Sequence, residues 1–237
     1  MSDARLASIA PDVWGTEHDH FMSGIVHFRG RMTVVRRPGA GLVLHSVNPI
    51  DDALAAELAA LGPVEHIIAP NLLHHVHLLP AIARYPDAKV WGAPGLAKKR
   101  ADVTFDAEIG DDAPWTDTLT PKPIRGIPWA NETVFLHAAS GSLIVTDLVF
   151  NIHEPKGWVA PLVLRLAGAY RKFAQSRLLR SQIKDAEAAS ASVLAMLEWD
   201  FDRVIMAHGR VVETNAKQQL RDALAPMIRP PALASAG

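Results

Sequence analysis

The chain has 237 residues, a length that suits one large domain or two small ones. Hydrophobic residues make up 49% and charged residues 21%, which is typical of a folded globular protein and excludes wholesale disorder. There is no Cys, which excludes thiolate metal sites, cysteine nucleophiles and iron–sulfur clusters, and which fits a reducing compartment. The formal net charge of −1 lacks the basic excess of nucleic-acid binders, and no signal-peptide or membrane-spanning run is present. We therefore expect a cytoplasmic protein that binds no nucleic acid and spans no membrane.

The first half of the chain predicts short strands followed by alternating helices and strands. Apolar, β-branched runs at 32–36 and 41–45 flank an Arg-Pro-Gly-Ala turn, which predicts a hairpin. Residues 51–62 open with two Asp, continue with Ala and Leu and close with Gly, which predicts a helix. A strand at 64–69, a helix at 72–85 and a strand at 88–92 are expected next. This order favours an α/β layered fold.

The second half repeats the strand pattern after an irregular stretch at 102–127. Strands are predicted at 133–137 and 142–146, joined as a hairpin by Ala-Ala-Ser-Gly. Further elements are expected as a helix at 185–197, a strand at 203–207 and a helix at 215–224. We predict a single domain over 1–237, with its core at about 11–225 and a flexible tail at 226–237.

A basic segment at 165–184 allows two interpretations. It contains four Arg and two Lys between Leu, Ala and Phe residues. We favour a solvated helix face whose apolar stripe lies in the core or in a homodimer interface. The alternative is an amphipathic face that docks on anionic lipid or covers a pocket as a lid.

Polar residues with metal-ligand chemistry follow three of the predicted strands. His74 and His75 follow the strand at 64–69, Asp147 ends the strand at 142–146, and His208 ends the strand at 203–207. The carboxyl ends of strands are where α/β folds place their sites. Imidazole and carboxylate are ligands for Zn²⁺, Fe or Mn²⁺, and an ion with an open position makes a nucleophile of water. The alternative is structural: such residues also cap backbone groups or accept hydrogen bonds from loops.

Other polar residues are secondary candidates. Asn71, His77 and His153 lie close in sequence to the expected ligands, and we assign them to substrate binding. The spacing of His18 and His20 would allow metal binding, but we interpret both as part of a solvated N-terminal loop.

The order of these segments resembles the metallo-β-lactamase-like superfamily and, more narrowly, the DUF4336 family. The resemblance covers most of residues 11–212 and implies an αββα four-layer sandwich, in which two mixed sheets pack face to face with helices outside. The matching segments are Phe21–Ile25, Arg31–Arg36, Ala69–His75, Pro94–Arg100, Thr133–His137 and Leu143–Leu148.

The resemblance also implies a degenerate metal motif. The superfamily pattern is His-x-His-x-Asp-His, and placing His74-His75 over its final Asp-His leaves Pro70 and Leu72 at the first two His. The Pro-Gly-His turn of the superfamily is replaced at 125–131 by a stretch without His. The three ligands of the first metal site are then missing.

On this alignment, the second metal site of the superfamily keeps its ligands or has a replacement for them. It keeps His74 in place of the Asp, together with His75, Asp147 as the bridging carboxylate, and His208, which implies one mononuclear site. A register shifted by one residue places Asn71 at the first His of the motif and leaves only Asp147 and His208.

Two functions follow from these observations. The first is a metal-dependent hydrolase of a small-molecule ester, lactone or phosphodiester, with one divalent ion, Zn²⁺ ahead of Fe or Mn²⁺, and with Asp147 and His208 as the catalytic residues. The second is a non-catalytic binding or scaffold protein that keeps the fold, has lost the dinuclear centre and holds no metal.

Overall fold

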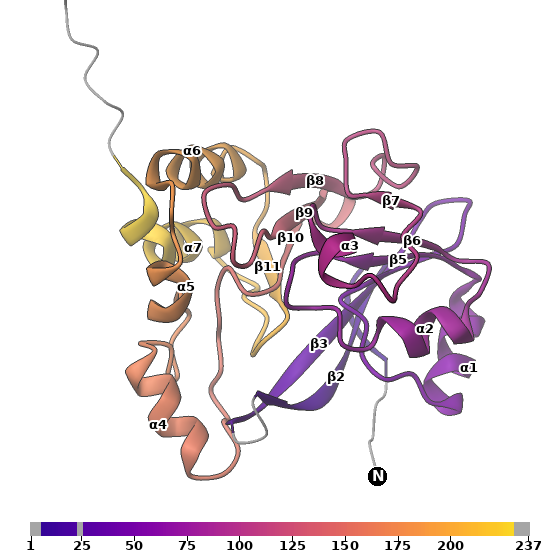
Figure 1. Cartoon of the computed structure of the whole chain (residues 1–237), viewed down its shortest axis with the longest axis horizontal. Helices are drawn as coiled ribbons and strands as arrows, with labels where there is room; N and C mark the ends of the chain where they lie inside the picture. The colour runs from indigo at the N-terminus through magenta and orange to yellow at the C-terminus, as the bar shows by residue number, and fades with distance from the viewer. Residues whose placement is uncertain (1–5, 23–25, 230–237) are drawn as a thin grey trace, which may run out of the picture.

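A computed structural model describes residues 6–22 and 26–229 of the chain. Over this part of the chain, two mixed β-sheets pack face to face and helices cover their outer faces (Figure 1). This is the αββα sandwich that the resemblance implies, so the expected fold class is confirmed.

The larger sheet has seven strands in the order of the chain. Its strands β1 to β4 pair antiparallel, and β4 to β7 pair parallel. The strands are β1 (Ala7–Ala10), β2 (Val13–Met22), β3 (Val26–Arg36), β4 (Leu42–His45), β5 (Val64–Ala69), β6 (Lys89–Gly92) and β7 (Ala107–Glu108).

The smaller sheet has four strands in the order β11-β10-β9-β8. Strands β10 and β11 run parallel, while β8 with β9 and β9 with β10 run antiparallel. The strands are β8 (Thr120–Pro123), β9 (Thr133–His137), β10 (Ser142–Val145) and β11 (Arg203–Met206), and a 3₁₀ turn, η1 (Ala138–Ser140), joins β9 to β10.

Helices cover both outer faces and one end of the sandwich (Figure 1). The helices are α1 (Asp52–Leu61), α2 (Leu78–Arg84), α3 (Leu96–Lys99), α4 (Val159–Leu166), α5 (Arg177–Ser181), α6 (Ala186–Leu197) and α7 (Ala216–Leu224), with a 3₁₀ turn, η2 (Ala225–Met227), at the end. α1 to α3 pack on the seven-stranded sheet, and α6 and α7 pack on the four-stranded sheet.

Alternation of side chains along the strands builds three apolar layers. In β4, Leu42 and Leu44 pack outward against α1 to α3, while Val43 faces the layer between the sheets. In β10, Leu143 packs outward against α6 and α7, while Ile144 faces the same inner layer. Successive residues of a strand point to opposite faces, so strands that are apolar throughout are buried on both sides. This inner layer shared by both sheets supports our proposal that the chain forms one domain.

Most of the predicted elements are confirmed. β3 and β4 form the hairpin, α1 starts after its N-cap Asp51 and ends at Gly62, and β5, β9, β10, α6, β11 and α7 lie where the sequence places them. The irregular stretch at 102–127 contains only the short strands β7 and β8.

Two predictions are wrong, one in where a helix begins and one in the type of element. The helix expected at 72–85 begins at Leu78, because the Asn71 side chain accepts hydrogen bonds from Leu73 N (2.8 Å) and His74 N (2.7 Å) and so holds a turn instead. The solvated loop expected around His18 and His20 is β2, which pairs with β3 along its whole length.

The C-terminal end of the described chain is packed. Met227 of η2 is buried against α6, so the predicted flexible tail does not begin at residue 226. Residues 230–237 of that predicted tail lie outside the described residues. Among the described residues, no helix is both long enough and apolar enough to span a bilayer.

Candidate metal centre

The candidate site forms where the ends of strands from both sheets meet. His74 lies in the loop after β5, Asp147 follows β10, and His208 follows β11. Backbone hydrogen bonds hold these ends together across the sheets: Arg31 N in β3 donates to Ala207 O (2.7 Å), and Thr133 N in β9 donates to Pro70 O (2.8 Å). The topology therefore brings three side chains that are far apart in sequence to one place.

Three ligand atoms converge at this place. His74 Nε2 lies 3.2 Å from Asp147 Oδ2 and 3.2 Å from His208 Nε2, and His208 Nε2 lies 3.6 Å from Asp147 Oδ1. One ligand atom from each residue lies within 4.8 Å of the others. His74, Asp147 and His208 are called the His/Asp centre below.

The spacing within the His/Asp centre fits a metal ion. Ligands about 2.0–2.1 Å from a tetrahedral Zn²⁺ are roughly 3.3 Å apart, close to the separations observed. Two imidazoles and one carboxylate leave a fourth position for water or substrate, as in catalytic rather than structural zinc sites. The donor set fits Fe²⁺ and Mn²⁺ as well.

Neighbouring groups orient His208 for this role. Its Nδ1 lies 2.9 Å from the Arg29 carbonyl, which leaves the lone pair of Nε2 directed at the centre. Phe150 stacks on the ring with centroids 5.5 Å apart, and Phe28 meets its face edge-on at 4.8 Å. Burial, together with the His74 imidazole, lowers the pKa of His208 to about 4, so the ring is neutral at physiological pH.

His74 is held on its other side by Ser46. Ser46 Oγ lies 2.6 Å from His74 Nδ1, and Ser46 adopts a left-handed backbone conformation (φ 58°) directly after β4. Such a conformation is uncommon for a residue other than Gly and is found at functional sites. Burial alone would lower the pKa of His74, but the adjacent Asp147 carboxylate outweighs burial and raises it.

A buried network fixes Asp147. Asn71 Nδ2 donates to Asp147 Oδ2 (2.8 Å), and the backbone N–H groups of Thr146 and Asp147 donate to the Glu132 carboxylate (2.6 and 2.9 Å). Although burial opposes ionisation, His74 and then His208 lower the pKa of Asp147, so this carboxylate is ionised. Burial and the charge of Asp147 raise the pKa of Glu132.

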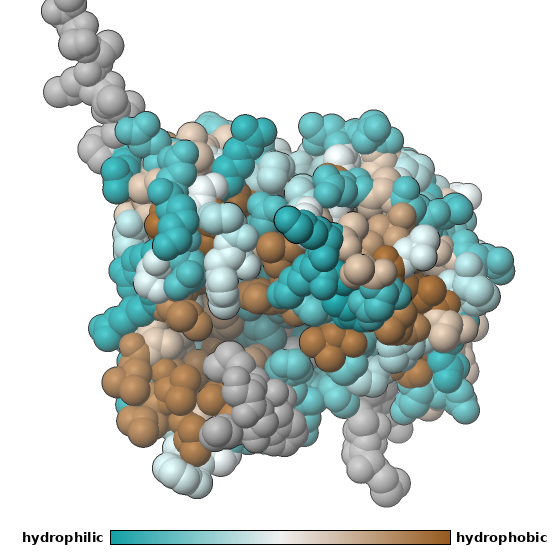
Figure 2. Space-filling model, viewed as in Figure 1, coloured by the Kyte–Doolittle hydropathy of each residue, from teal (hydrophilic) through white to brown (hydrophobic). Residues whose placement is uncertain are grey.

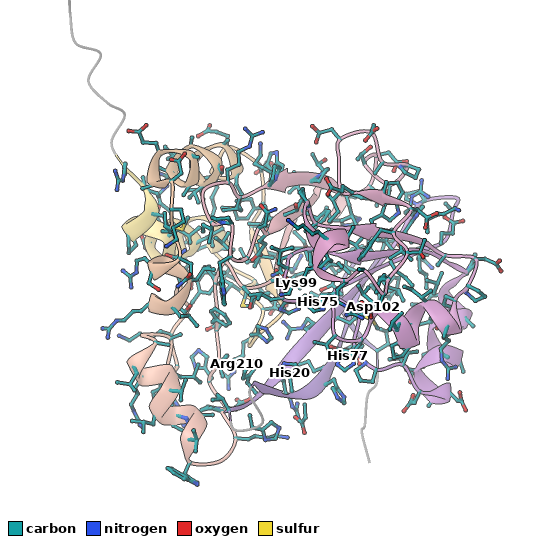
Figure 3. The ribbon with its side chains drawn as sticks, in the orientation of Figure 1. His20, His75, His77, Lys99, Asp102 and Arg210 are labelled. Carbon is teal, nitrogen blue, oxygen red and sulfur yellow. The ribbon has the colours of Figure 1, made fainter. Side chains whose placement is uncertain are left out.

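The structure does not bring His75 into the His/Asp centre. Its Nδ1 lies 3.0 Å from Arg100 Nη1, which also donates to the His75 carbonyl (2.7 Å). In Figure 3, His75 lies beside Lys99 and Asp102. The turn held by Asn71 directs His74 rather than His75 at Asp147. The centre therefore holds three of the four ligands of the first register, and we leave His75 out of the proposed ligand set.

The three expected substrate contacts occupy different places. His77 lines the cavity over the centre, with its pKa lowered to about 4 by burial and by His18 and His20. Asn71 is fully buried beneath Asp147 and donates to that carboxylate, so we leave it out of the proposed substrate contacts. His153 bonds to Asn151 Oδ1 (2.9 Å) and does not belong to the described lining of the cavity.

The cavity itself has a volume of about 480 Å³ and ends at the His/Asp centre. The polar lining residues that sequence reasoning missed include His20, Ser46, Asn48 and Ser176. Ser46 follows a predicted strand and could have been found by the same strand-end rule as Asp147. His20 was missed because strand β2 was interpreted as a loop. His20 and His77 are labelled in Figure 3.

Comparison with solved structures places the fold in a known class. The chain is similar to a metallo-β-lactamase from Pontibacter korlensis (14% identity, TM-score 0.62), covering 94% of this chain and 98% of that one. It is also similar to the metallo-β-lactamase FIM-1 from Pseudomonas aeruginosa in a mono-zinc form (14%, TM-score 0.58, 95% and 96% covered). A third similar structure is the metal-soaked Flv1 flavodiiron core from Synechocystis sp. PCC6803 (12%, TM-score 0.61, 95% and 61% covered). The chain therefore has the metallo-β-lactamase fold.

Comparison of sequences gives the family. The family described as "Domain of unknown function (DUF4336)" matches residues 12–192, and the chain belongs to it. This confirms the resemblance found in the sequence. A search of the curated proteins found no match.

Proposed function

We propose that this protein is a hydrolase that depends on one divalent metal ion, with Zn²⁺ ahead of Fe²⁺ or Mn²⁺, held by His74, Asp147 and His208. The observation that carries the proposal is the convergence of three ligand atoms, 3.2–3.6 Å apart in the pairs named above, at one end of a cavity large enough for a small molecule. A similar fold that is recorded with one zinc ion, in FIM-1, supports a mononuclear centre.

A divalent ion held here would act as a Lewis acid and would lower the pKa of water enough to supply a nucleophile near neutral pH. The residues of the chain prepare the site for this chemistry. The Arg29 carbonyl and Ser46 hold the two imidazoles with Nε2 inward, and Asn71 holds Asp147 Oδ2. The ionised Asp147 provides the negative charge that a divalent cation needs in a buried place.

The ligand spacing argues for catalysis rather than for a scaffold role. A protein that kept only the fold would have no need to hold two imidazole nitrogens 3.2 Å apart next to a carboxylate. The left-handed backbone of Ser46 and the burial of Glu132 beneath Asp147 both lower the stability of the folded protein at the same place. The non-catalytic alternative remains as an outcome of the experiment below.

The experiment measures metal content and hydrolysis together. Protein grown with ample Zn²⁺, Fe and Mn²⁺ is expected to hold about one ion per chain, located by anomalous diffraction at the His/Asp centre. It is expected to hydrolyse 4-nitrophenyl butanoate, and Asp147→Asn should lose both the ion and the activity. The matched control is Asp202→Asn, which alters an exposed carboxylate just before β11, at the opposite end of the same sheet.

Two results would contradict the proposal. Full turnover by the metal-free protein would show that no ion is needed. An empty centre in metal-rich medium, in a protein that binds a small molecule without converting it, would support the non-catalytic alternative.

Three further expectations from the sequence stay predictions: a cytoplasmic location, no binding of nucleic acid, and a homodimer. For the dimer, the structure shows that α4 buries Ala160 and Leu164 but exposes Leu162 and Leu166 on its outer face. Sedimentation of the wild-type chain and of Leu162→Ser is expected to differ if this face joins two copies.

A further inference from the structure

One wall of the cavity is apolar and is built by α4, α5 and the segment after β10. Its side chains are aliphatic or aromatic, and one of them, Phe150, also stacks on His208 of the His/Asp centre. They include Phe150, Ile152, Val163, Leu164, Leu178 and Leu179. A ligand that reaches the centre therefore lies against this wall for much of its length.

The described lining offers no positive side chain. None of the lining residues is Lys or Arg, and Asp147 is the single carboxylate among them. Arg100, which contacts His75 at the lining, is already bonded to Asp102 (2.8 Å) and to the His75 carbonyl. Phosphate and carboxylate groups are usually bound by bidentate Arg or by Lys, so apart from the metal ion proposed above the described lining holds no cation for an anionic substrate.

The exposed part of the lining is apolar as well. Val76, Trp129 and Leu178 line the cavity and are also 57%, 41% and 50% exposed, so they form its rim. Next to this rim, apolar residues gather over α4 on the surface shown in Figure 2. An apolar chain that enters or leaves the cavity thus stays in contact with apolar side chains.

Apart from Ser176, the N-cap residue of α5, the polar lining lies around the His/Asp centre. Ser46 contacts His74, His20 is close enough to feel the charges of His74 and Asp147, and Asn48 and His77 complete this polar lining. The cavity is therefore two-sided, and the molecule that fits it has a polar reacting group at one end and an apolar chain at the other.

We propose that the substrate is an uncharged acyl ester or lactone whose apolar chain lies along the α4–α5 wall. This inference rests on the proposed function and narrows its substrate class by setting phosphodiesters aside. In the reaction, the oxygen of water bonds to the acyl carbon and the acyl C–O bond breaks. The proton of water passes to the departing alkoxide, so the products are a carboxylic acid and an alcohol, and no oxidant or reductant is needed.

The experiment compares 4-nitrophenyl esters from acetate to dodecanoate with bis(4-nitrophenyl) phosphate, using the metal-loaded full chain. Each methylene buried on the wall should raise kcat/KM about fourfold until the cavity is filled. The phosphodiester should be hydrolysed more slowly than any ester of eight carbons or more. A flat profile across the esters, or a phosphodiester that is the best substrate, would overturn the inference.

A matched pair of variants tests whether the dependence of kcat/KM on chain length comes from the apolar wall. Leu178→Gln should reduce the gain per methylene to about twofold, because Leu178 belongs to the rim. Leu166→Gln should leave it unchanged, because Leu166 is 67% exposed on α4 and does not line the cavity. An equal reduction of the gain per methylene in both variants would contradict binding of the chain along the apolar wall.

A binding measurement separates this inference from the proposed function. Calorimetry with 2-alkanones of increasing length is carried out on the Asp147→Asn protein, which should not hydrolyse esters. Affinity that rises with chain length, without ester hydrolysis by the wild-type protein, would support the apolar wall and contradict the hydrolase. Ester hydrolysis by the wild-type protein without any dependence on chain length would support the hydrolase and contradict the apolar wall.

Discussion

Two serine–histidine pairs of nearly the same geometry lie near opposite ends of β10. Ser46 Oγ contacts His74 Nδ1 at 2.6 Å, and Ser140 Oγ contacts His137 Nδ1 at 2.7 Å. β10 has four residues and spans about 13 Å. Asp147 follows its C-terminal end, where the Ser46–His74 pair lies. The pairs differ in their surroundings: His74 meets a buried carboxylate, a second imidazole and a cavity, while His137 ends a strand without such partners in the described residues.

The comparison shows what makes a site in this fold. A buried histidine with a hydroxyl partner is simply a satisfied core residue, as His137 is. His74 becomes chemically different because Asp147 and His208 arrive from the ends of two parallel strands. The electrostatic result is visible in the pKa values, since burial lowers that of His137 while Asp147 raises that of His74.

The largest expected effect comes from removing one of the three metal ligands, and the control removes a buried histidine at the other end of β10. His208→Ala should weaken metal binding by more than the roughly 10–100-fold that loss of an outer partner costs, because a metal–ligand bond is lost outright. Affinity is measured by competition with a chelating dye. His137→Ala should bind metal with wild-type affinity, and an equal loss in both variants would mean that the effect is one of folding.

A smaller effect is expected from the two serines. Ser46→Ala removes the hydroxyl that orients His74 and should lower metal affinity about 10–100-fold. Ser140→Ala removes an equivalent hydrogen bond at the other end and should leave metal affinity unchanged. The same dye competition checks both, and wild-type affinity in Ser46→Ala would remove Ser46 from the site.

The smallest effect is on the pH dependence of metal binding. The raised pKa of His74 means that its ring carries a proton below that pKa in the metal-free protein, and an ion must displace this proton to bind. Affinity should therefore rise with pH, by at most about tenfold per unit, and level off above the pKa of His74. His208, with its pKa lowered to about 4, is already neutral and should release no second proton at about pH 6.

Calorimetry in buffers of different ionisation enthalpy measures the number of protons released. About one proton per ion is expected at about pH 6 if His74 is a ligand. Release of no proton would remove His74 from the ligand set. Imidazole NMR of the metal-free protein supplies the comparison, since His137 should stay neutral where His74 is protonated.

Much of the fold follows from local sequence patterns. The apolar runs of β5, β10 and β11 and the N-cap Asp51 of α1 are local signals, and each is found in the structure. β2 was missed because its sequence contains two His, an Asp and a Glu, and its strand conformation depends on pairing with β3. The late start of α2 was missed because the Asn71 side chain competes for the backbone N–H groups that would open a helix.

The sequence by itself determined which residue types stand at the ends of three strands, and this was enough to select His74, Asp147 and His208 as candidates. Only the tertiary structure decided that His74 rather than the adjacent His75 faces Asp147, since one turn of backbone around Asn71 sets the direction of both side chains. Tertiary packing also placed Ser46 against His74 and Glu132 beneath Asp147, and it built the apolar wall of the cavity from α4 and α5. The physical reason is that ligand geometry depends on ångström-scale contacts between segments far apart in the chain, whereas strand and helix patterns depend on near neighbours.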